Sequence, residues 1–466
     1  MKLRLSSAIL TGKLAAKLSR VCGYGGSSFP GLLARLFYPG ALKKLAAQVR
    51  KGIIVVTGTN GKTTTANMIT GVLQEAGFKT ISNREGANMI SGITTSFIMN
   101  SIASGKIDCD YAVIEVDEAS IPEVLNNLSP RLVVVTNFFQ DQLDRYWELG
   151  QVIGIIRDSL LGQKQATLVL NADDPLVAQF QRTTGLPAYY FGLAGDKNPG
   201  KRDPAARETS LCPFCGSPLV YNYCHYGQLG AYSCPDCGFT RPRPQVEAME
   251  AGAEGGYNLT YPGAPVPSIA LEMQTQGLHN VYNALAAFSV SILLGVNLQT
   301  ILVGLRKYRP AIGRMEKFRY GNKQVYLNLV KNSTGFNQGL ETLCEDRGGG
   351  DVLIVLNDNF ADSRDISWIW DVNFEMLTVR QKRLGCFICS GLRGEEMALR
   401  LKYAGIPTGK IVTNTSMNQA VKAVLRSNRR STYIFSTYTA LRPVHKIIES
   451  LVEKGDKSDQ GMPSVS

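Results

Sequence analysis

Two groups of residues have the types and spacing that ligand or metal binding requires. The first is a glycine-rich loop. The segment Gly58-Thr59-Asn60-Gly61-Lys62-Thr63-Thr64 follows a β-branched run at 53–57 and precedes a helical pattern that extends to about residue 76. Such a loop binds phosphate, because glycines let backbone N–H groups face the oxygens and the helix N-terminus adds its positive dipole end. We expect Lys62 to neutralise the β- and γ-phosphates of a nucleotide and the Thr63 hydroxyl to help hold Mg²⁺.

The second group consists of four cysteines in two C-x-x-C pairs with eighteen residues between the pairs: Cys212, Cys215, Cys234 and Cys237. Four thiolates on two tight turns match the tetrahedral coordination of Zn²⁺ and leave no open position for a reacting water. The spacing therefore predicts a structural zinc ribbon.

The remaining cysteines do not form a second pattern of this strength. Cys224 and His225 lie between the two pairs and are interpreted as ordinary residues of the ribbon. The pair Cys386 and Cys389 lies in a segment that is typical of a buried strand, where cysteine packs as a small apolar side chain. The uneven placement of the ten cysteines indicates a metal site in a reducing compartment, so we expect a cytoplasmic location.

Length and composition indicate a globular protein with several domains. The chain has 466 residues, 44% of them hydrophobic and 19% charged, which excludes a fibrous or largely disordered protein. The net charge of +12 suits an anionic partner, or simply a soluble basic protein. No uninterrupted apolar run of about 18 residues is present, so no transmembrane helix is expected. Residues 1–20 are interpreted as a basic amphipathic helix, not as a signal peptide.

The elements that must position these groups predict an α/β fold with a parallel sheet. Strand-like runs at 53–57, 111–116, 132–136 and 167–170 alternate with helical patterns, which is typical of a doubly wound P-loop domain. New strands at 325–330 and 352–357 indicate a second, Rossmann-like α/β domain. We therefore expect the following division: an N-terminal helical segment at 1–50, a central ATP-binding domain at 51–312 with the ribbon inserted at about 205–243, a C-terminal domain at 313–453 and a disordered tail at 454–466.

Five ordered segments resemble the Mur ligase family. They are the loop GTNGKT, the strand end VIEVDEAS, TNFFQDQLDRYWELG at 136–150, LNADDP at 170–175 and HNVYNALAA at 279–287. Gln142 stands where the family usually has histidine. The resemblance implies that Glu115 binds magnesium, that Asn283 contacts the adenine of ATP and that Arg314, at the hinge before the last domain, reaches phosphate.

Further features resemble one branch of that family, the MurT subunits. Only about fifty residues precede the loop, so the UDP-sugar domain of ordinary Mur ligases is expected to be missing. The segment NDNFADSRDISWIWDVNFE at 357–375 resembles the MurT signature, with Ser363 in place of a glycine, and KNSTGFNQ at 331–338 resembles another segment, with Ser333 in place of a proline. By this match Asp365 completes a catalytic triad whose cysteine and histidine belong to a glutaminase partner, GatD.

The resemblance implies an ATP-dependent carbon–nitrogen ligase. It would phosphorylate the α-carboxyl of D-glutamate in the stem peptide of lipid II, and ammonia from the GatD partner would displace the phosphate and leave D-isoglutamine. Lys62, Thr63 and Glu115 would stabilise the phosphoryl transfer. The implied cofactors are Mg²⁺ and structural Zn²⁺, with ATP as the nucleotide. We expect no nucleic-acid partner, and the basic N-terminal helix suggests contact with the inner membrane face.

Two alternatives stay open at this point. One is another Mur-like amide ligase of the folylpolyglutamate or cyanophycin type, against which the segment 357–375 argues. The other is a zinc-ribbon ATPase that binds nucleic acid, which the net charge would favour.

Overall fold

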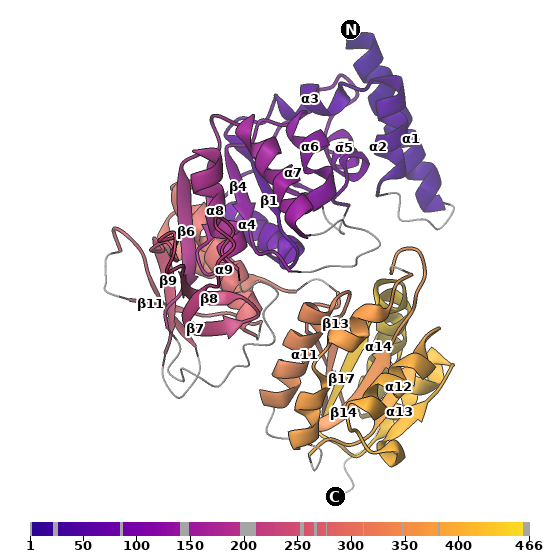
Figure 1. Ribbon diagram of the computed structural model, residues 1–466. Coiled ribbons are helices and arrows are strands. Elements are labelled where there is room, and N and C mark those ends of the chain that lie inside the picture. Colours follow the sequence, from indigo (N-terminus) through magenta and orange to yellow (C-terminus); the bar gives the residue numbers. More distant parts are fainter. Residues whose placement is uncertain are drawn as a thin grey trace, which may run out of the picture. The chain divides into compact units, whose positions relative to one another are not determined.

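The computed structural model describes residues 2–21, 27–83, 87–139, 149–195, 211–251, 256–264, 268–275, 277–310, 312–345, 349–362, 364–380 and 383–459. They form two compact units (Figure 1). The first consists mainly of residues up to Tyr308, and the second contains the chain from Arg309 onward. This boundary lies close to Gly313, where the sequence placed the start of the last domain.

A nine-stranded sheet forms the centre of the first unit, in the order β11-β10-β9-β6-β5-β4-β1-β3-β2. Neighbouring strands from β2 to β9 are parallel, while β10 and β11 are antiparallel additions at one edge. The strands are β1 (Gly52–Thr57), β2 (Thr80–Ser82), β3 (Tyr111–Glu115), β4 (Leu132–Val135), β5 (Thr167–Asn171), β6 (Ala188–Leu193), β9 (Val246–Glu250), β10 (Tyr257–Thr260) and β11 (Ile269–Leu271). The four strands that the sequence predicted in this unit are confirmed as β1, β3, β4 and β5.

Helices cover this sheet because its central strands are apolar on both faces. Ile54 and Val56 of β1 share one core with residues of α4, α9 and α10, and the alternate residues Ile53 and Val55 are equally buried. The helices are α4 (Lys62–Glu75), α5 (Ile90–Met99), the 3₁₀ turn η2 (Glu118–Ser120), α6 (Ile121–Leu125), α7 (Leu149–Leu161), α8 (Pro175–Thr184), α9 (Leu278–Leu293) and α10 (Leu298–Lys307). The predicted α/β architecture with a parallel sheet is therefore confirmed.

Three helices precede the sheet: α1 (Lys2–Val21), α2 (Phe29–Phe37) and α3 (Ala41–Ala46). Helix α1 packs on α2, and α2 packs on α5 (Figure 1). The sequence had predicted one basic helix over residues 1–20, and the structure adds α2 and α3 to it.

An insertion separates β6 from β9. Its strands β7 (Val220–Tyr226) and β8 (Leu229–Ser233) form a two-stranded antiparallel sheet with an irregular register. The two cysteine pairs lie just before and just after this hairpin.

The second unit contains a six-stranded sheet in the order β12-β13-β17-β14-β15-β16, in which β12 alone is antiparallel to its neighbour. The strands are β12 (Glu316–Tyr320), β13 (Lys323–Leu329), β14 (Gly350–Val355), β15 (Phe387–Ser390), β16 (Ile411–Thr413) and β17 (Ser431–Ser436). The predicted strands at 325–330 and 352–357 are thus found as β13 and β14.

Helices lie on both faces of this second sheet, and two separate apolar cores result. They are α11 (Ser333–Glu345), η5 (Ser367–Asp371), η6 (Phe374–Arg380), α12 (Gly394–Tyr403), η7 (Thr408–Lys410), α13 (Met417–Arg426) and α14 (Tyr438–Asp459). Helix α14 extends to Asp459, past residue 454, where the sequence predicted the start of a disordered tail.

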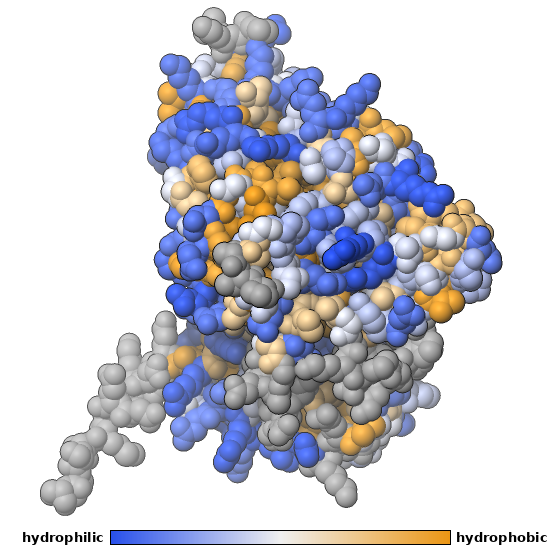
Figure 2. All heavy atoms as spheres, turned by 90° about the vertical axis from the view of Figure 1, so that its left-hand side faces the viewer, coloured by the Kyte–Doolittle hydropathy of each residue, from blue (hydrophilic) through white to orange (hydrophobic). Residues whose placement is uncertain are grey.

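The surface is predominantly polar on the face that Figure 2 presents, where hydrophobic residues occur in smaller patches between hydrophilic ones. Within the described residues, none of the helices is both long enough and apolar enough to cross a membrane.

Candidate functional site

The glycine-rich loop connects β1 to α4 in a conformation that requires its glycines. Gly58 has a φ of +116° and Gly61 a φ of +86°, backbone angles that residues other than glycine rarely adopt. Space is also limited: a Cβ on Gly61 would lie 2.1 Å from Oδ1 of Asn283, and a Cβ on Gly58 would lie 2.4 Å from Oγ1 of Thr136. The loop therefore has the tight backbone of a phosphate cradle at a helix N-terminus.

The segment that follows β4 holds this loop in place. The Asn60 N–H donates to Oδ1 of Asn137 at 3.0 Å, and the Thr59 N–H donates to the Asn137 carbonyl at 2.8 Å. The Thr136 hydroxyl donates to the Asn60 carbonyl at 2.8 Å. Thr136 and Asn137, the first two residues of the segment 136–150, therefore fix the backbone of the loop. Gln142, in the same segment, lies outside the described residues.

Lys62, the first residue of α4, points back into the loop and is only 7% exposed. Its ammonium group donates to the Gly58 carbonyl at 2.6 Å and to the Thr59 carbonyl at 3.2 Å. It also lies 3.1 Å from both carboxylate oxygens of Glu118. The predicted phosphate ligand is therefore at the loop, and a buried carboxylate neutralises it.

Glu115 ends β3 beside the loop, because β3 pairs with β1 in the register Glu115 to Val56. Its side chain is buried, and Oε1 accepts a hydrogen bond from Nδ2 of Asn88 at 3.4 Å. The Glu115 backbone is fixed on both sides by Asn83. A carboxylate at the carboxyl end of a parallel strand, together with the half-buried Thr63 hydroxyl, supplies oxygen ligands of the kind that Mg²⁺ prefers. The donor set fits a magnesium ion.

Sequence analysis missed Glu118. It lies three residues after Glu115, in a 3₁₀ turn that Asp117 caps by accepting a hydrogen bond from the Ala119 N–H. This turn directs Glu118 toward Lys62. The signal available in the sequence was the second glutamate in VIEVDEAS, but only the fold shows which of the two glutamates pairs with the lysine.

Removing Glu118 should destabilise the nucleotide-free protein, since the buried Lys62 ammonium group would lose the carboxylate that lies 3.1 Å from it. We expect Glu118→Ala to lower the free energy of unfolding by about 3 kcal/mol or more. The matched control is Glu123→Ala, which breaks the more exposed pair with Arg35 and should cost at most about 1 kcal/mol. Urea unfolding of both variants measures the difference, and equal losses would contradict a buried pair at the loop.

Asn283 on α9 lies against the same loop, since a Cβ on Gly61 would lie 2.1 Å from its Oδ1. Its predicted contact with adenine stays a prediction. Its Oδ1 accepts a hydrogen bond from the Thr65 hydroxyl at 3.2 Å, and its Nδ2 lies 3.4 Å from Oδ1 of Asn280. The loop residues, Glu115 and Asn283 thus come together in the first unit, although they are far apart in the sequence.

The two aspartates of LNADDP have structural partners. Asp173 accepts hydrogen bonds from Arg241 Nε at 2.6 Å, from the Tyr282 hydroxyl at 2.7 Å and from the Leu193 N–H at 2.8 Å. It thereby ties the end of β5 to the insertion and to α9. Asp174 caps α8, and burial raises its pKa to about 7 although two backbone N–H groups donate to it.

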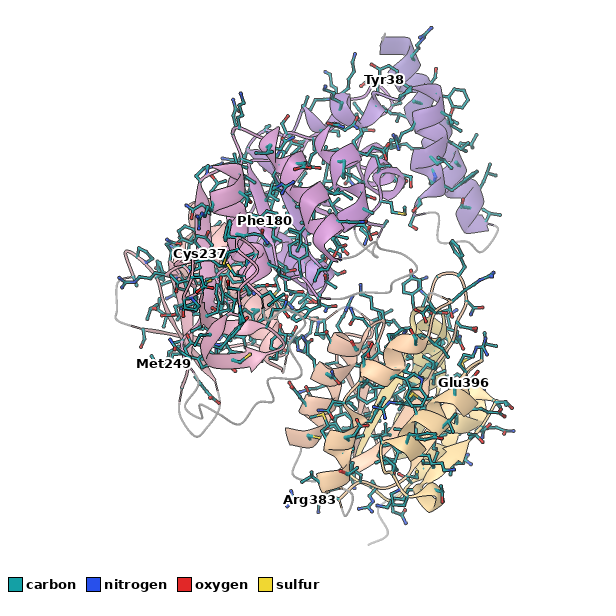
Figure 3. The ribbon with its side chains drawn as sticks, in the orientation of Figure 1. Tyr38, Phe180, Cys237, Met249, Arg383 and Glu396 are labelled. Carbon is teal, nitrogen blue, oxygen red and sulfur yellow. The ribbon has the colours of Figure 1, made fainter. Side chains whose placement is uncertain are left out.

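The four predicted zinc ligands come together at the base of the hairpin β7–β8, where Figure 3 labels Cys237. The four sulfur atoms lie within 4.8 Å of one another. Sγ of Cys212 is 3.4 Å from that of Cys237, and Sγ of Cys215 is 3.4 Å from that of Cys234. Tetrahedral coordination with Zn–S bonds of about 2.3 Å places sulfur atoms about 3.8 Å apart. The cysteine set therefore fits a zinc ion.

The hairpin above this cysteine cluster packs on the segments that follow β4 and β5 in the first unit. The Tyr232 hydroxyl donates to the Ala172 carbonyl at 3.1 Å, and the Gly230 N–H donates to the Asp173 carbonyl at 2.9 Å. Gln228 is buried against Phe138, to whose carbonyl its amide donates. The insertion is thus an integral part of the first unit.

Cys237→Ser should therefore destabilise the first unit as well as abolish zinc binding. We expect the metal content to fall below one zinc per chain and Tm to fall by about 10 °C or more, because the metal supplies much of the folding energy of such a module. Cys224→Ser is the control: its thiol donates to the Gly227 carbonyl, and it is not a member of the cluster. Elemental analysis and calorimetry test this, and full zinc content in Cys237→Ser would refute the assignment.

The prediction of a buried strand is confirmed for Cys389 in β15, whereas Cys386 lies just before that strand. Cys389 is completely buried in the core of the second unit, and burial raises the pKa of its thiol to about 12. Cys386 is half-buried, with its Sγ 3.4 Å from Oδ1 of Asp351. Neither residue belongs to a group of potential metal ligands among the described residues.

Asp365 lies in the second unit, in the loop that follows β14. Its Oδ1 accepts a hydrogen bond from the Ser367 N–H at 2.8 Å, and its side chain is partly exposed. Asp358 and Asp362 in the same loop have structural partners, since Asp358 pairs with Arg393 at 2.7 Å and Asp362 accepts a hydrogen bond from the Thr439 N–H at 2.7 Å. Ser363 lies outside the described residues.

Arg314 also belongs to the second unit and is half-buried. It lies in a turn between Gly313, with a φ of +73°, and Met315, with a φ of +51°. The predicted contact of Arg314 with phosphate stays a prediction.

Comparison with known proteins agrees with this geometry. The family profile "Mur ligase middle domain" matches residues 56–212, and "MurT ligase C-terminal" matches residues 329–441. The chain is 38% identical to the lipid II isoglutaminyl synthase (glutamine-hydrolyzing) subunit MurT of Staphylococcus aureus strain N315, over 97% of this chain and 100% of that protein. It is 34% identical to the protein of the same name from Streptococcus pneumoniae R6, over 97% and 98% of the two chains.

Solved structures share the fold. A pseudomurein peptide ligase type C from Methanothermus fervidus superimposes with a TM-score of 0.67 at 24% identity, covering 87% of this chain and 80% of that one. MurF from Acinetobacter baumannii gives a TM-score of 0.64 at 17% identity, covering 91% and 81%. The fold and the nucleotide loop thus define a ligase of the Mur type. Within that class, the chain belongs to the MurT family.

Proposed function

We propose that the chain is the synthetase subunit of a lipid II isoglutaminyl synthase, an enzyme of peptidoglycan biosynthesis. It amidates the α-carboxyl of D-glutamate in the lipid II stem peptide at the expense of ATP. The observation that carries this proposal is the identity of 34–38% along nearly the whole chain to relatives of that name. The loop with Lys62 gives the proposal its chemical basis.

The first unit carries out the ATP-dependent step. The Gly58–Thr64 loop binds the phosphates of ATP, with Lys62 turned from Glu118 toward the β- and γ-oxygens. Thr63 and Glu115 would hold Mg²⁺, which would offset negative charge on the phosphates. Asn283 lies against the loop, where it contacts the nucleotide base. Transfer of the γ-phosphoryl group to the substrate carboxylate makes an acyl phosphate, and ammonia then displaces phosphate to form the amide.

Zinc is assigned a structural role. The four cysteines that we propose as its ligands fill all positions of a tetrahedral site, and their hairpin packs on the segments that carry Asp173 and Phe138. The metal keeps this hairpin folded beside the nucleotide domain and takes no part in the reaction.

The second unit contributes one residue, Asp365, to the active site of the glutaminase. We propose that a GatD-type partner hydrolyses glutamine, and that Asp365 orients and stabilises the partner's histidine in a nucleophile–histidine–aspartate arrangement. Two features support this: the carboxylate is partly exposed on the loop after β14, and Trp370, on the neighbouring turn, is 50% exposed. Partly exposed aromatic residues of this kind are common in protein interfaces.

Nucleotide turnover tests the proposed substrate against the folylpolyglutamate alternative. With MgATP and an ammonium salt, ADP release should depend on lipid II, and folate with glutamate should not replace it. Turnover that requires a folate would overturn the substrate assignment, although the chain would still be a Mur-type ligase.

A further inference from the structure

Helix α1 exposes an apolar stripe on the side that faces away from the protein. Leu10, Leu14 and Leu18 are 55%, 59% and 57% exposed, and their spacing of four residues places them on one face. The opposite face, with Ala8, Ile9 and other apolar residues, is buried. The helix is therefore apolar on two sides, only one of which the protein covers.

Helix α2, which packs beside α1, buries small residues and exposes large apolar ones, the opposite of most surface helices. Its buried residues include the small Gly31 and Ala34, whereas Leu32, Leu36 and Phe37 are exposed. A water-exposed helix normally turns its large apolar side chains toward the core. Here three large apolar side chains are exposed on a helix that packs on α1.

Close packing on α5 fixes this orientation of α2. The Gly31 N–H donates to the Thr95 hydroxyl at 2.8 Å, and a Cβ on Gly31 would lie 1.9 Å from the Ser91 carbonyl oxygen. Only the small face of α2 fits against α5. Rotation of α2 to bury Leu36 and Phe37 would remove this fit, so the exposed surface is a property of the fold.

The charged side chains of the N-terminal region are all basic. Residues 1–51 contain ten Lys and Arg residues and no Asp or Glu, and the first acidic residue of the chain is Glu75. Arg4, Lys17 and Lys43 are exposed. Positive charge beside an outward apolar stripe matches the two requirements of an interfacial helix on anionic lipid, namely apolar insertion and headgroup attraction.

We propose that α1 and α2 form a docking surface for an anionic lipid bilayer, which we call the N-terminal apolar surface: Leu10, Leu14, Leu18, Leu32, Leu36 and Phe37. These side chains enter the boundary between headgroups and acyl chains, and the surrounding Lys and Arg side chains contact the anionic headgroups. The surface holds the enzyme at the membrane without a spanning helix. The inference deepens the proposed function and rests on it for its purpose, since lipid II is membrane-borne, but its physical basis is independent of the reaction.

Vesicle co-sedimentation of the full chain tests the proposal. Wild type should bind vesicles of phosphatidylcholine with phosphatidylglycerol and bind much less to phosphatidylcholine alone, and added salt should weaken binding. The variant Leu10→Ser/Leu14→Ser/Leu18→Ser should lose about tenfold or more in partitioning. Met249→Gln is the control, because Met249 is a similarly exposed apolar residue on β9 (52%) outside this surface (Figure 3).

Three results would overturn the proposal. One is equal binding of the triple variant and wild type, and another is no dependence of wild-type binding on anionic lipid. The third is a wild-type dimer in sedimentation that the triple substitution dissociates, which would make a second copy of the chain the occupant.

Amidation of detergent-dispersed lipid II separates this proposal from the proposed function. The triple variant should retain amidation. Any of the three results, obtained with a wild-type chain that amidates lipid II, would refute only the membrane surface.

Discussion

Replacing Lys62 by alanine should lower kcat/KM for ATP-dependent amidation by about a thousandfold or more. The Lys62 ammonium group lies at the centre of the loop, among the carbonyls of Gly58 and Thr59. A positioned cation that stabilises the charge of a transferring phosphoryl group contributes about 10³-fold or more to the rate. Steady-state ADP release with lipid II and ammonium measures the loss.

A second variant separates this chemical role from stability. Lys62→Ala removes the ammonium group beside the buried Glu118 carboxylate, so part of the loss could arise from local unfolding. Lys62→Met/Glu118→Gln removes both charges and should recover the free energy of unfolding without recovering activity. If this double variant regained more than about a tenth of wild-type activity, Lys62 would be a structural residue and the phosphate role would be wrong.

Asp365→Asn should abolish glutamine-driven amidation while leaving ammonia-driven amidation unchanged. Asparagine keeps the acceptor for the Ser367 N–H but loses the charge that would stabilise the partner's imidazolium. The same replacement in a nucleophile–histidine–aspartate triad lowers kcat by about 10⁴-fold. The two rates are measured on the complex with the glutaminase subunit, with glutamine or with ammonium chloride as the nitrogen source.

Asp371→Asn is the matched control, since it makes the same chemical change at an exposed aspartate six residues away in the same segment. It should leave both rates near those of wild type. If Asp365→Asn instead lowered the glutamine-driven and the ammonia-driven rates equally, the residue would serve the fold or the synthetase, and the triad assignment would have to be withdrawn.

The sequence was most informative for groups of residues that lie close together along the chain. Gly58, Gly61 and Lys62 are defined by a strand, a loop and a helix within a few residues, and the cysteine pairs by two tight turns, so their grouping could be predicted without the fold. The strands were predictable for a similar reason, because a parallel sheet covered on both faces needs continuous apolar runs.

What the sequence did not show depends on contacts between distant residues. The pairing of Glu118 with Lys62 requires β3 to lie beside β1, and the tie between Asp173, Arg241 and Tyr282 joins three segments across a hundred residues. The outward face of α2 is a further case, since an apolar helix in a sequence is normally interpreted as buried. Only the close fit of Gly31 against α5 reveals which side is covered.

The most direct test of the account is mass spectrometry of lipid II after incubation with the purified chain, its glutaminase partner, MgATP and glutamine. We expect one amide per molecule, located by fragmentation at the α-carboxyl of D-glutamate, and no product when ATP is omitted or when Lys62→Ala replaces wild type. Unmodified lipid II in the complete reaction, or an added amino acid in place of the amide, would contradict it.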